Sequence, residues 1–515
     1  MVELNARDML SAASAASATL PAGSAMPRGP RKLSAAALAA ASQNPRAAYS
    51  PIVVAGFVRV IECVLIALAG SISYAAYVIP QHGFSWIYGM AIAAISAMSI
   101  IAFQAADIYQ IHAFRRPVAQ MARLFSAWSI VFLIATAVSF FGKFDVWFSR
   151  VWLLSFYAGG LALLLTERTI LYTFVRRWMQ DGRLTRRTVI VGGGDPGANL
   201  ITALRHQRDS DVQIVGVFDD RNDERSPTIC AGFEKLGTVD DFVEFARRTR
   251  IDLVIFSLPI TAETRILQML KKLWVLPLDI RLAAHLNKLR FRPRSYSYIG
   301  NVPVLDVFDR PMADWDVVMK WLFDKVVGGF ALLLALPVMA MIAIAIKLDS
   351  RGPVLFKQKR YGFNNDLIEV YKFRSMYVEA TDATASKLVT KNDPRVTRVG
   401  RFIRKASLDE LPQLFNVVFK GNLSLVGPRP HAVNAKAETR LYDEVVDGYF
   451  ARHRVKPGVT GWAQVNGWRG ETDTQEKIQK RVEYDLYYIE NWSVLFDLYI
   501  VAITPFALLK TENAY

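Results

Sequence analysis

Four long apolar stretches constrain how this chain can fold more than any other feature of its sequence. They run roughly over Ile52–Ile79, Trp86–Ala106, Leu124–Phe141 and Val151–Phe174. Each can supply the ~20 helical residues that are needed to cross about 30 Å of hydrocarbon. The sequence therefore predicts a multi-pass membrane protein with a four-helix transmembrane bundle over residues 51–178.

The basic residues around these stretches predict their orientation. They gather before the first stretch, between the second and third, and after the fourth: Arg28, Arg31, Lys32 and Arg46; Arg115, Arg116 and Arg123; Arg176, Arg177, Arg183, Arg186 and Arg187. In the other two connections, the stretches QHGFS and GKFDVWFS hold a single lysine, Lys143. Because Lys and Arg mark cytoplasmic loops, both ends of the bundle are expected in the cytoplasm.

The composition agrees with a membrane setting. Of the 515 residues 52% are hydrophobic, yet the formal net charge is +16. Anionic headgroups attract basic cytoplasmic faces, whereas nucleic-acid binding is disfavoured because no basic–aromatic recognition motif accompanies the charge.

The two cysteines, Cys63 and Cys230, cannot build a disulfide framework. Residues 1–50 lack a sustained apolar core and predict a disordered tail, not a signal peptide.

A glycine-rich turn follows the bundle. Gly192, Gly194 and Gly197 form G-x-G-x-x-G between the strand-like run Thr188–Val191 and an apolar helical pattern, and a second strand ends at Asp219. This context predicts a Rossmann-like cytoplasmic α/β domain over residues 179–305. The domain has no Tyr-x-x-x-Lys pair for hydride chemistry, and a bound dinucleotide is not expected. The alternative is a regulatory or assembly domain whose glycines only make the turn.

A further apolar segment, Val326–Ile346, contains Pro337 in its middle and charged residues at both ends. A mid-helix proline kinks a helix. We therefore predict a re-entrant membrane helix over about residues 321–347, with a simple fifth span as the alternative.

Near the end of the chain, an apolar helix containing Asp497 is predicted to be interfacial, because a charge at mid-bilayer costs roughly 2.5–3.5 kcal/mol.

The stretch KASLDELPQLFNV places Asp409 and Glu410 beside a basic run. One interpretation is helix capping, with Ser407 and Glu410 as a capping box and Gly421 ending the helix. The alternative is catalysis. Residues 393–405 carry arginines every three residues and predict an amphipathic helix with a basic stripe. Arg429 stands between two prolines, which would fix its guanidinium for bidentate phosphate binding.

Phosphate-binding cations around one carboxylate pair suit phosphoryl transfer. One carboxylate can attack as a nucleophile and hold a divalent metal, while its neighbour orients or neutralises. Mg²⁺ is the natural ion, because it takes one or two carboxylates together with substrate phosphates; Mn²⁺ is the alternative.

The motifs SLDELPQLFNVVFKGNLSLVGPRP, YKFRSM and RHRVKPGVTGWAQVNG resemble those of the bacterial sugar transferase family, the polyprenyl-phosphate hexose-1-phosphate transferases. The resemblance is close over residues 315–515 and implies an α+β catalytic domain over residues 306–515. Together with the bundle and the Rossmann-like domain, it points to the large phosphoglycosyl transferases with a monotopic core, which start exopolysaccharide, capsule or O-antigen synthesis. It implies that hexose 1-phosphate passes from a UDP-hexose to undecaprenyl phosphate, releasing UMP. Glucose is the expected hexose and galactose the alternative.

The resemblance also assigns roles to individual residues. It implies that Asp409 is the nucleophile, forming a covalent sugar-phosphoryl aspartate, and that Glu410 assists metal binding. Arg404 would meet the polyprenyl phosphate, and Arg429 would bind phosphate.

Three further positions match the family's site. Lys372 and Asp485 occupy polar positions expected around the substrates. Trp462, in the segment Val455–Gly467, would stack on uracil or else pack in the core.

Finally, the resemblance places the chain in the bacterial inner membrane, in contact with membrane lipids. Its catalytic domain is expected on the cytoplasmic face, and a homodimer is the expected assembly.

Two other classes of protein remain as alternatives. One is an inactive scaffold of polysaccharide assembly, against which the intact Asp409, Glu410 and Arg429 argue. The other is a nucleotide-sugar dehydratase or epimerase in the Rossmann-like domain, which the missing Tyr-x-x-x-Lys pair disfavours.

Overall fold

A computed structural model shows the chain as two compact units, residues 45–186 and residues 1–44 together with 187–515. The described residues are 32–43, 48–109, 117–143, 148–207, 211–221, 226–258, 262–283, 297–299, 302–378, 393–431, 436–437, 440–441, 449–468 and 474–509. Most of the predicted tail, residues 1–31, lies outside the described residues, as do Arg46, Arg115 and Arg116.

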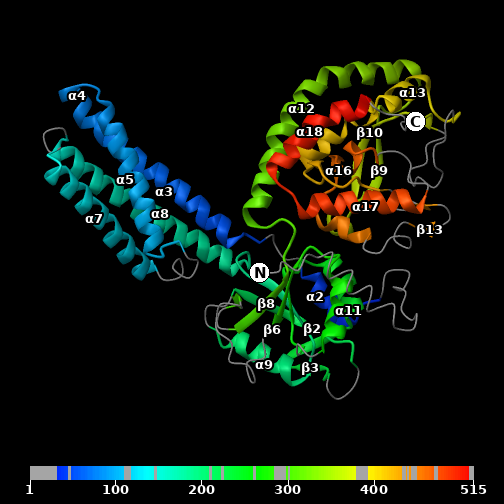
Figure 1. Cartoon of the computed structure of the whole chain (residues 1–515), viewed down its shortest axis with the longest axis horizontal. Helices are drawn as coiled ribbons and strands as arrows, with labels where there is room; N and C mark the ends of the chain where they lie inside the picture. Colours follow the sequence, from blue (N-terminus) through cyan, green and yellow to red (C-terminus); the bar gives the residue numbers. More distant parts are fainter. Residues whose placement is uncertain are drawn as a thin grey trace. The chain divides into compact units, whose positions relative to one another are not determined.

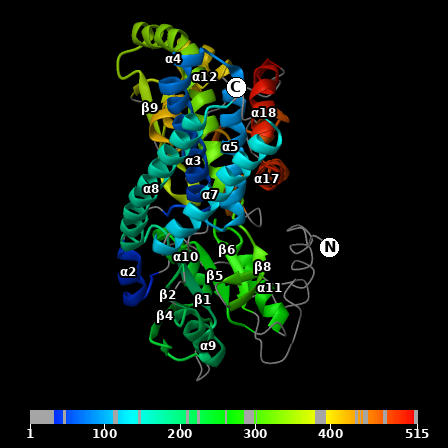
Figure 2. The same cartoon turned by 90° about the vertical axis from the view of Figure 1, so that its left-hand side faces the viewer.

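The unit of residues 45–186 is helical. Its helices are α3 (Pro51–Ser73), which continues through a π-helical turn η1 (Tyr74–Val78) into α4 (Ile79–His82), then α5 (Trp86–Ala105), α7 (Pro117–Phe141) and α8 (Arg150–Gln180). Helices α3 and α7 each contact both α5 and α8, and the four run side by side in Figures 1 and 2. All four are long and apolar enough to cross a membrane, as the sequence predicts.

Aromatic side chains fill the centre of this unit. Trp128, Trp152 and Phe156 are fully buried, and Trp152 Nε1 donates a hydrogen bond to the carbonyl of Gly70 at 3.2 Å. A Cβ atom on Gly160 would lie 2.5 Å from the Trp128 ring. Glycine at this position therefore lets α7 and α8 approach closely.

A buried ion pair also joins these helices. Glu62 lies within α3 and is 0% exposed. Its carboxylate accepts hydrogen bonds from Arg168 Nη2 of α8 at 2.5 Å and from the Tyr109 hydroxyl at 2.6 Å. Ionisable residues inside a membrane bundle usually pair with one another in this way.

The second unit begins with an α/β domain built on a mixed sheet. Its strands are β1 (Arg186–Val191), β2 (Val212–Phe218), β3 (Ile229–Cys230), β4 (Phe233–Gly237), β5 (Leu253–Phe256), β6 (Asp279–Ala283), β7 (Ser297–Ile299) and β8 (Val302–Phe308). The strand order is β3-β4-β2-β1-β5-β6-β8-β7, and Figure 2 shows it from β4 to β8. Its core order, β4-β2-β1-β5-β6, matches doubly wound α/β folds, while β8 pairs antiparallel with β6.

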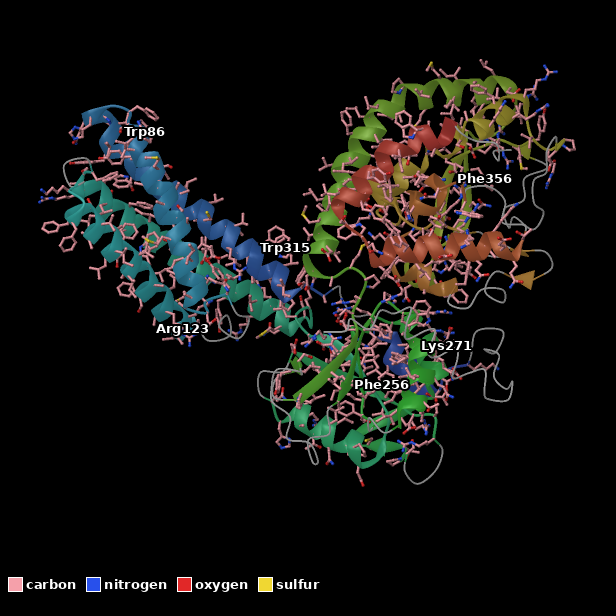
Figure 3. All side chains as sticks on the ribbon, in the orientation of Figure 1. Trp86, Arg123, Phe256, Lys271, Trp315 and Phe356 are labelled. Carbon is pink, nitrogen blue, oxygen red and sulfur yellow. The ribbon has the colours of Figure 1, made fainter. Side chains whose placement is uncertain are left out.

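Alternate residues of the central strands face different helices. Val189 and Val191 of β1 pack in one cluster with α10 (Val239–Arg248) and α11 (Glu263–Leu273), whereas Ile190 packs in another with α9 (Gly194–Arg205). Strand β5 alternates likewise, and its last residue, Phe256, lies fully buried within the domain (Figure 3). Helices therefore cover both faces of the sheet, as expected for nearly continuous apolar strands.

One part of the predicted disordered tail is ordered. Residues Ala35–Ser42 form helix α2, whose first turn is capped by Ser34 Oγ. The same Ser34 hydroxyl donates to the carbonyl of Leu236 at 2.7 Å, and Leu33 and Ala37 are buried in the cluster with α10. The alanine-rich sequence lacks an apolar core of its own, but it completes the core of the α/β domain.

The rest of the chain forms an α+β domain around the long helix α12 (Asp314–Asp349). Figure 1 shows that α12 is bent, and it contains Pro337. Leu332, Met339, Ile342 and Ile346 bury one face of α12 in the domain core, while the other face exposes residues such as Leu333, Ile344 and Leu348. Because soluble surfaces rarely expose such a large apolar patch, this face is suited to lipid.

Short elements complete the domain: β9 (Leu355–Tyr361), η4 (Phe363–Asn365), β10 (Leu367–Phe373), α13 (Arg398–Lys405), η6 (Leu408–Glu410), α14 (Gln413–Phe415), η7 (Asn416–Lys420), β11 (Ser424–Val426), β12 (Lys436–Ala437), β13 (Arg440–Leu441), η8 (Tyr449–Arg454), β14 (Gly458–Thr460), α16 (Trp462–Val465), α17 (Gln475–Glu490) and α18 (Val494–Leu509).

A buried polar network attaches α12 to this domain. Lys320 Nζ donates to Asp497 Oδ2 of α18 at 2.6 Å and to the carbonyl of Val426 at 2.9 Å. Asp324 Oδ1 accepts from the backbone N–H of Leu425 at 3.0 Å. Asp497 is 0% exposed, so its charge is met by Lys320 within the protein.

Replacing Lys320 with methionine should destabilise the protein by about 3–5 kcal/mol, because it leaves Asp497 buried without its cation. Chemical or thermal unfolding of the detergent-solubilised protein measures this loss. Lys347→Met, at an exposed position of the same helix, is the control and should unfold like the wild type. Equal stability of the two variants would show that the network contributes little.

Candidate active site

A β-hairpin brings Lys372 into the site. Strand β10 pairs antiparallel with β9, and Lys372 lies opposite Phe356. The Asn416 side chain fixes the hairpin, because Oδ1 accepts from the N–H of Tyr371 at 2.9 Å and Nδ2 donates to the carbonyl of Glu369 at 2.7 Å. Arg374, two residues further on, instead donates to the carbonyls of Ser350 and Arg351 at the end of α12.

The predicted basic helix is shorter than residues 393–405. Thr397 caps α13 by accepting from the N–H of Gly400 at 2.9 Å. Before it, the Asp393 carboxylate binds the guanidinium of Arg395 at 2.6 Å. The helix therefore begins at Arg398 and ends at Lys405.

The capping-box interpretation of Ser407 and Glu410 is wrong. Ser407 has φ +57°, in the left-handed region, and its N–H donates to the carbonyl of Arg404 at 3.0 Å. It thus ends α13, as left-handed residues often do. Asp409 and Glu410 follow in the single 3₁₀ turn η6, while Gly421, with φ +65°, ends the next helical segment as predicted.

Two cations bind Glu410. Lys372 Nζ donates to Glu410 Oε1 at 2.9 Å, and Arg429 Nη2 donates to the same oxygen at 2.7 Å. Arg429 Nη1 donates to the side-chain oxygen of Gln464 at 3.0 Å. The structure thus brings together three of the predicted site residues, which are far apart in the sequence.

Asp409 lies beside this cluster and is half-buried. Burial raises the pKa of Asp409 to about 6; the charge of Lys372 opposes the shift, and that of Glu410 adds to it. Arg404 also lowers the pKa of Asp409, so this predicted residue acts on the same carboxylate.

Two glycines allow the segment that carries Arg429 to fit. Strand β11 pairs parallel with β14, and a Cβ atom on Gly458 would lie 2.1 Å from the nitrogen of Gly427. Only glycine permits this approach. Arg429 follows directly after the pairing and faces Glu410.

A cavity of about 180 Å³ opens beside Glu410. Polar and apolar side chains line it: Ser407, Glu410, Leu411, Leu414, Val459, Thr460, Gln464, Val465, Thr504 and Ala507. The cavity therefore leads from a carboxylate to Thr504 and Ala507 of α18.

Two predicted residues lie elsewhere. Asp485 is buried on α17 and forms an ion pair with Arg452 at 2.5 Å, so its carboxylate does not line the cavity. Trp462 packs against Phe496 with ring centroids 5.0 Å apart, near Tyr487 and Tyr499. Its surroundings correspond to the core-packing alternative for this residue.

Sequence reasoning missed Gln464 and Arg452. Gln464 lies within the quoted segment Val455–Gly467, which was a usable signal. Arg452 is the first residue of the quoted motif RHRVKPGVTGWAQVNG, but nothing local in the sequence indicates its buried contacts.

Side chains of the α/β domain itself bind the polar groups around its glycine turn. Gly192 and Gly194 have positive φ, and Gly197 packs against the turn, where a Cβ atom would lie 2.6 Å from the carbonyl of Gly192. Asp219 Oδ2 accepts from the N–H of Gly193 and from Arg221 Nη2, both at 2.8 Å. A dinucleotide ribose would have to displace Arg221 to reach Asp219.

Asp409 and Glu410 alone do not supply enough ligands for a metal ion, so substrate phosphates would have to complete its coordination shell. Among the described residues, no group of three or more His, Cys, Asp or Glu side chains could hold a metal. Asp409 and Glu410 offer the one or two carboxylates that Mg²⁺ takes when substrate phosphates complete its shell.

Comparisons with known proteins show the family to which the chain is similar. The model of the bacterial sugar transferase family matches residues 315–511, and that of a CoA-binding domain matches residues 104–284. The UDP-glucose:undecaprenyl-phosphate glucose-1-phosphate transferases of Xanthomonas campestris pv. campestris and Escherichia coli (strain K12) are 34% and 36% identical to this chain, over 89% and 84% of it and 94% and 91% of the relatives. The undecaprenyl-phosphate glucose phosphotransferase of Komagataeibacter xylinus is 38% identical over 69% of this chain and 65% of the relative.

The apolar helices, the carboxylate pair and these matches together define a membrane-associated transferase. The chain belongs to the bacterial sugar transferase family.

Two buried histidines next to the site should make stability depend on pH. Burial and the nearby Arg452 hold the pKa values of His431 and His453 well below the usual range. Below pH ~6.5 the unfolded histidines take up protons that the folded protein excludes. The free energy of unfolding should therefore fall on acidification, by up to about 1.4 kcal/mol per pH unit for each histidine.

Thermal unfolding from pH 7.5 to 5.0 checks this dependence. His431→Gln should lose less stability over this range than the wild type, whereas the control His206→Gln, at an exposed position, should follow the wild type. Parallel curves for all three proteins would contradict a neutral, buried His431.

Proposed function

We propose that this protein transfers glucose 1-phosphate from UDP-glucose to undecaprenyl phosphate and releases UMP. The reaction would be the first membrane step in the synthesis of an exopolysaccharide, capsule or O-antigen. The observation that carries the proposal is the binding of Glu410 by Lys372 and Arg429 directly beside Asp409. The names of three relatives, all glucose phosphate transferases, support glucose over galactose.

The proposed mechanism has two displacements at the β-phosphorus of UDP-glucose. A carboxylate oxygen of Asp409 attacks this phosphorus, and the bond to the bridging oxygen breaks, so that UMP leaves with the bonding electrons. A phosphate oxygen of undecaprenyl phosphate then attacks the phosphoryl aspartate, forming the lipid diphosphate sugar and restoring the carboxylate. Covalent catalysis divides one exchange between two large anions into two displacements at a fixed site.

Cationic side chains of the site would assist this chemistry through the positions in which they are held. Arg429 and Lys372 hold Glu410 and keep positive charge where phosphate charge develops, which is the main source of catalysis in phosphoryl transfer. Arg404, at the end of α13, faces the same carboxylate pair and would meet the acceptor phosphate. Asp409 and Glu410 would hold Mg²⁺, which when bound neutralises the charge of the diphosphate.

The membrane arrangement belongs to the same proposal. Helices α3, α5, α7 and α8 would form a transmembrane bundle in the bacterial inner membrane, with both ends in the cytoplasm, as the distribution of basic residues indicates. Helix α12 would enter the membrane and return at its bend, which keeps the site in the cytoplasmic headgroup layer. The α/β domain would serve regulation or assembly of a homodimer, because Asp219 is already bound by Arg221.

Replacing Asp409 with asparagine should lower UMP release from UDP-glucose by at least about 10³-fold, because the nucleophile is lost. The assay supplies undecaprenyl phosphate and Mg²⁺ and compares UDP-glucose with UDP-galactose. Glu369→Gln, an exposed carboxylate on β10, is the control and should keep its activity. Equal UMP release by Asp409→Asn and wild type would exclude Asp409 as the nucleophile, and inactivity of the wild type with both donors would favour a scaffold.

A re-entrant α12 places both of its ends on the same side of the membrane. Single cysteines at Asp316 and Arg351, which are both exposed, in a Cys63→Ser/Cys230→Ala background test this arrangement with an impermeant maleimide. Both should react in inverted vesicles and neither in right-side-out vesicles. Labelling of Arg351→Cys only in right-side-out vesicles would instead show a fifth span.

A further inference from the structure

Three consecutive carbonyls around Arg429 each accept a hydrogen bond from a fixed donor. The carbonyl of Pro428 accepts from the N–H of Gly458 at 2.9 Å, and that of Arg429 accepts from Arg452 Nη2 at 2.8 Å. The carbonyl of Pro430 accepts from Arg360 Nη1 at 2.9 Å. Since the two prolines have no N–H, carbonyls are the main means of holding this segment.

Arg452 differs from the other two donors because its side chain is fully buried. It comes from η8, and its guanidinium is 0% exposed. Arg360, in contrast, lines the small pocket that also contains Lys372, Glu410 and Arg429. Arg452 therefore has no surface for a substrate and can act only through its protein neighbours.

Those neighbours fix the guanidinium in one orientation. Arg452 Nη2 donates to Asp485 Oδ2 at 2.5 Å as well as to the carbonyl of Arg429, and Nη1 lies 2.6 Å from Nδ1 of His431. Burying a cation is costly unless it is paired with good geometry, and Asp485 supplies that pairing. The planar fork of arginine presents its donors to the carboxylate and the carbonyl in one fixed geometry.

A continuous chain of contacts thus leads from α17 to the carboxylate pair: Asp485, Arg452, the backbone of Arg429, the guanidinium of Arg429 and Glu410. A displacement of about 1 Å at a reacting centre can lower the rate about 100-fold. Loss of the Arg452 contact frees the one carbonyl that belongs to Arg429 itself.

We propose that Arg452, held by Asp485, is a positioning residue that fixes the backbone of Arg429 so that its guanidinium stays on Glu410. This inference rests on the proposed transferase function for its kinetic consequences. It explains why Asp485 belongs with the site although it is buried behind it.

The test compares Arg452→Met with Arg481→Met. Arg481 is a buried arginine of the same cluster, whose Nε donates to the carbonyl of Trp468 at 2.7 Å. With UDP-glucose, undecaprenyl phosphate and Mg²⁺, Arg452→Met should lower kcat about 100-fold. Arg481→Met should stay within about threefold of the wild type.

A double-mutant cycle separates positioning from general damage. If Arg452 acts through Arg429, Arg452→Met should lower kcat by no more than about threefold in an Arg429→Gln background. A full and additive loss in that background would overturn the proposal. Because Arg452→Met leaves Asp485 buried without its cation, Arg452→Met/Asp485→Asn is measured too, and it should recover the melting temperature but not kcat.

Amide hydrogen exchange provides a readout that does not need turnover. The N–H groups of Gly427, Arg429 and His431 should exchange faster in Arg452→Met than in wild type, and at the wild-type rate in Arg481→Met. Unchanged exchange in Arg452→Met would overturn the positioning role. If the wild type releases no UMP, the proposed function fails, while the exchange comparison still decides whether Arg452 holds this segment.

Discussion

The ion pairs of Glu410 with Lys372 and Arg429 are the interaction on which the site depends. They join a hairpin strand, a 3₁₀ turn and a proline-flanked segment that share little local structure. Without cations, two adjacent half-buried carboxylates would repel each other and disfavour ionisation. With them, positive charge lowers the pKa of Asp409, although burial still holds it at about 6, and phosphate compounds meet a smaller electrostatic barrier on approaching the carboxylates.

The same pairing explains how much of the site the sequence could predict. Asp409, Glu410, Lys372 and Arg429 stand in motifs whose charges and prolines already indicate phosphate chemistry, and the structure brings them together. Asp485 could be named but not placed, because its partner Arg452 lies 33 residues away. Arg452 is the first residue of a quoted motif, but its role could not be predicted, since it depends on a carbonyl that tertiary folding brings to it.

The fold, like the site, could be predicted from the sequence only in part. The long apolar stretches predict the long helices, and the glycine motif predicts the turn between strand and helix. Both features are present in the structure. The errors come from tertiary contacts that override local preference. Ser407 resembles a cap but adopts a left-handed conformation to end α13. The burial of Glu62 and of Asp497 likewise depends on distant partners, Arg168 and Lys320, which local sequence does not indicate.

The docking of helix α2 on the α/β domain has a topological consequence. Ser34 bonds to Leu236 of β4, and β1 of the same sheet begins just after α8 ends. The chain therefore leaves one folded domain, passes through the apolar helices and returns to that domain. If these helices cross a bilayer, as proposed, one sheet cannot be divided between its two sides, so the segments between residues 43 and 186 would cross it an even number of times. The docking of a short alanine-rich helix would thus fix the parity of the crossings.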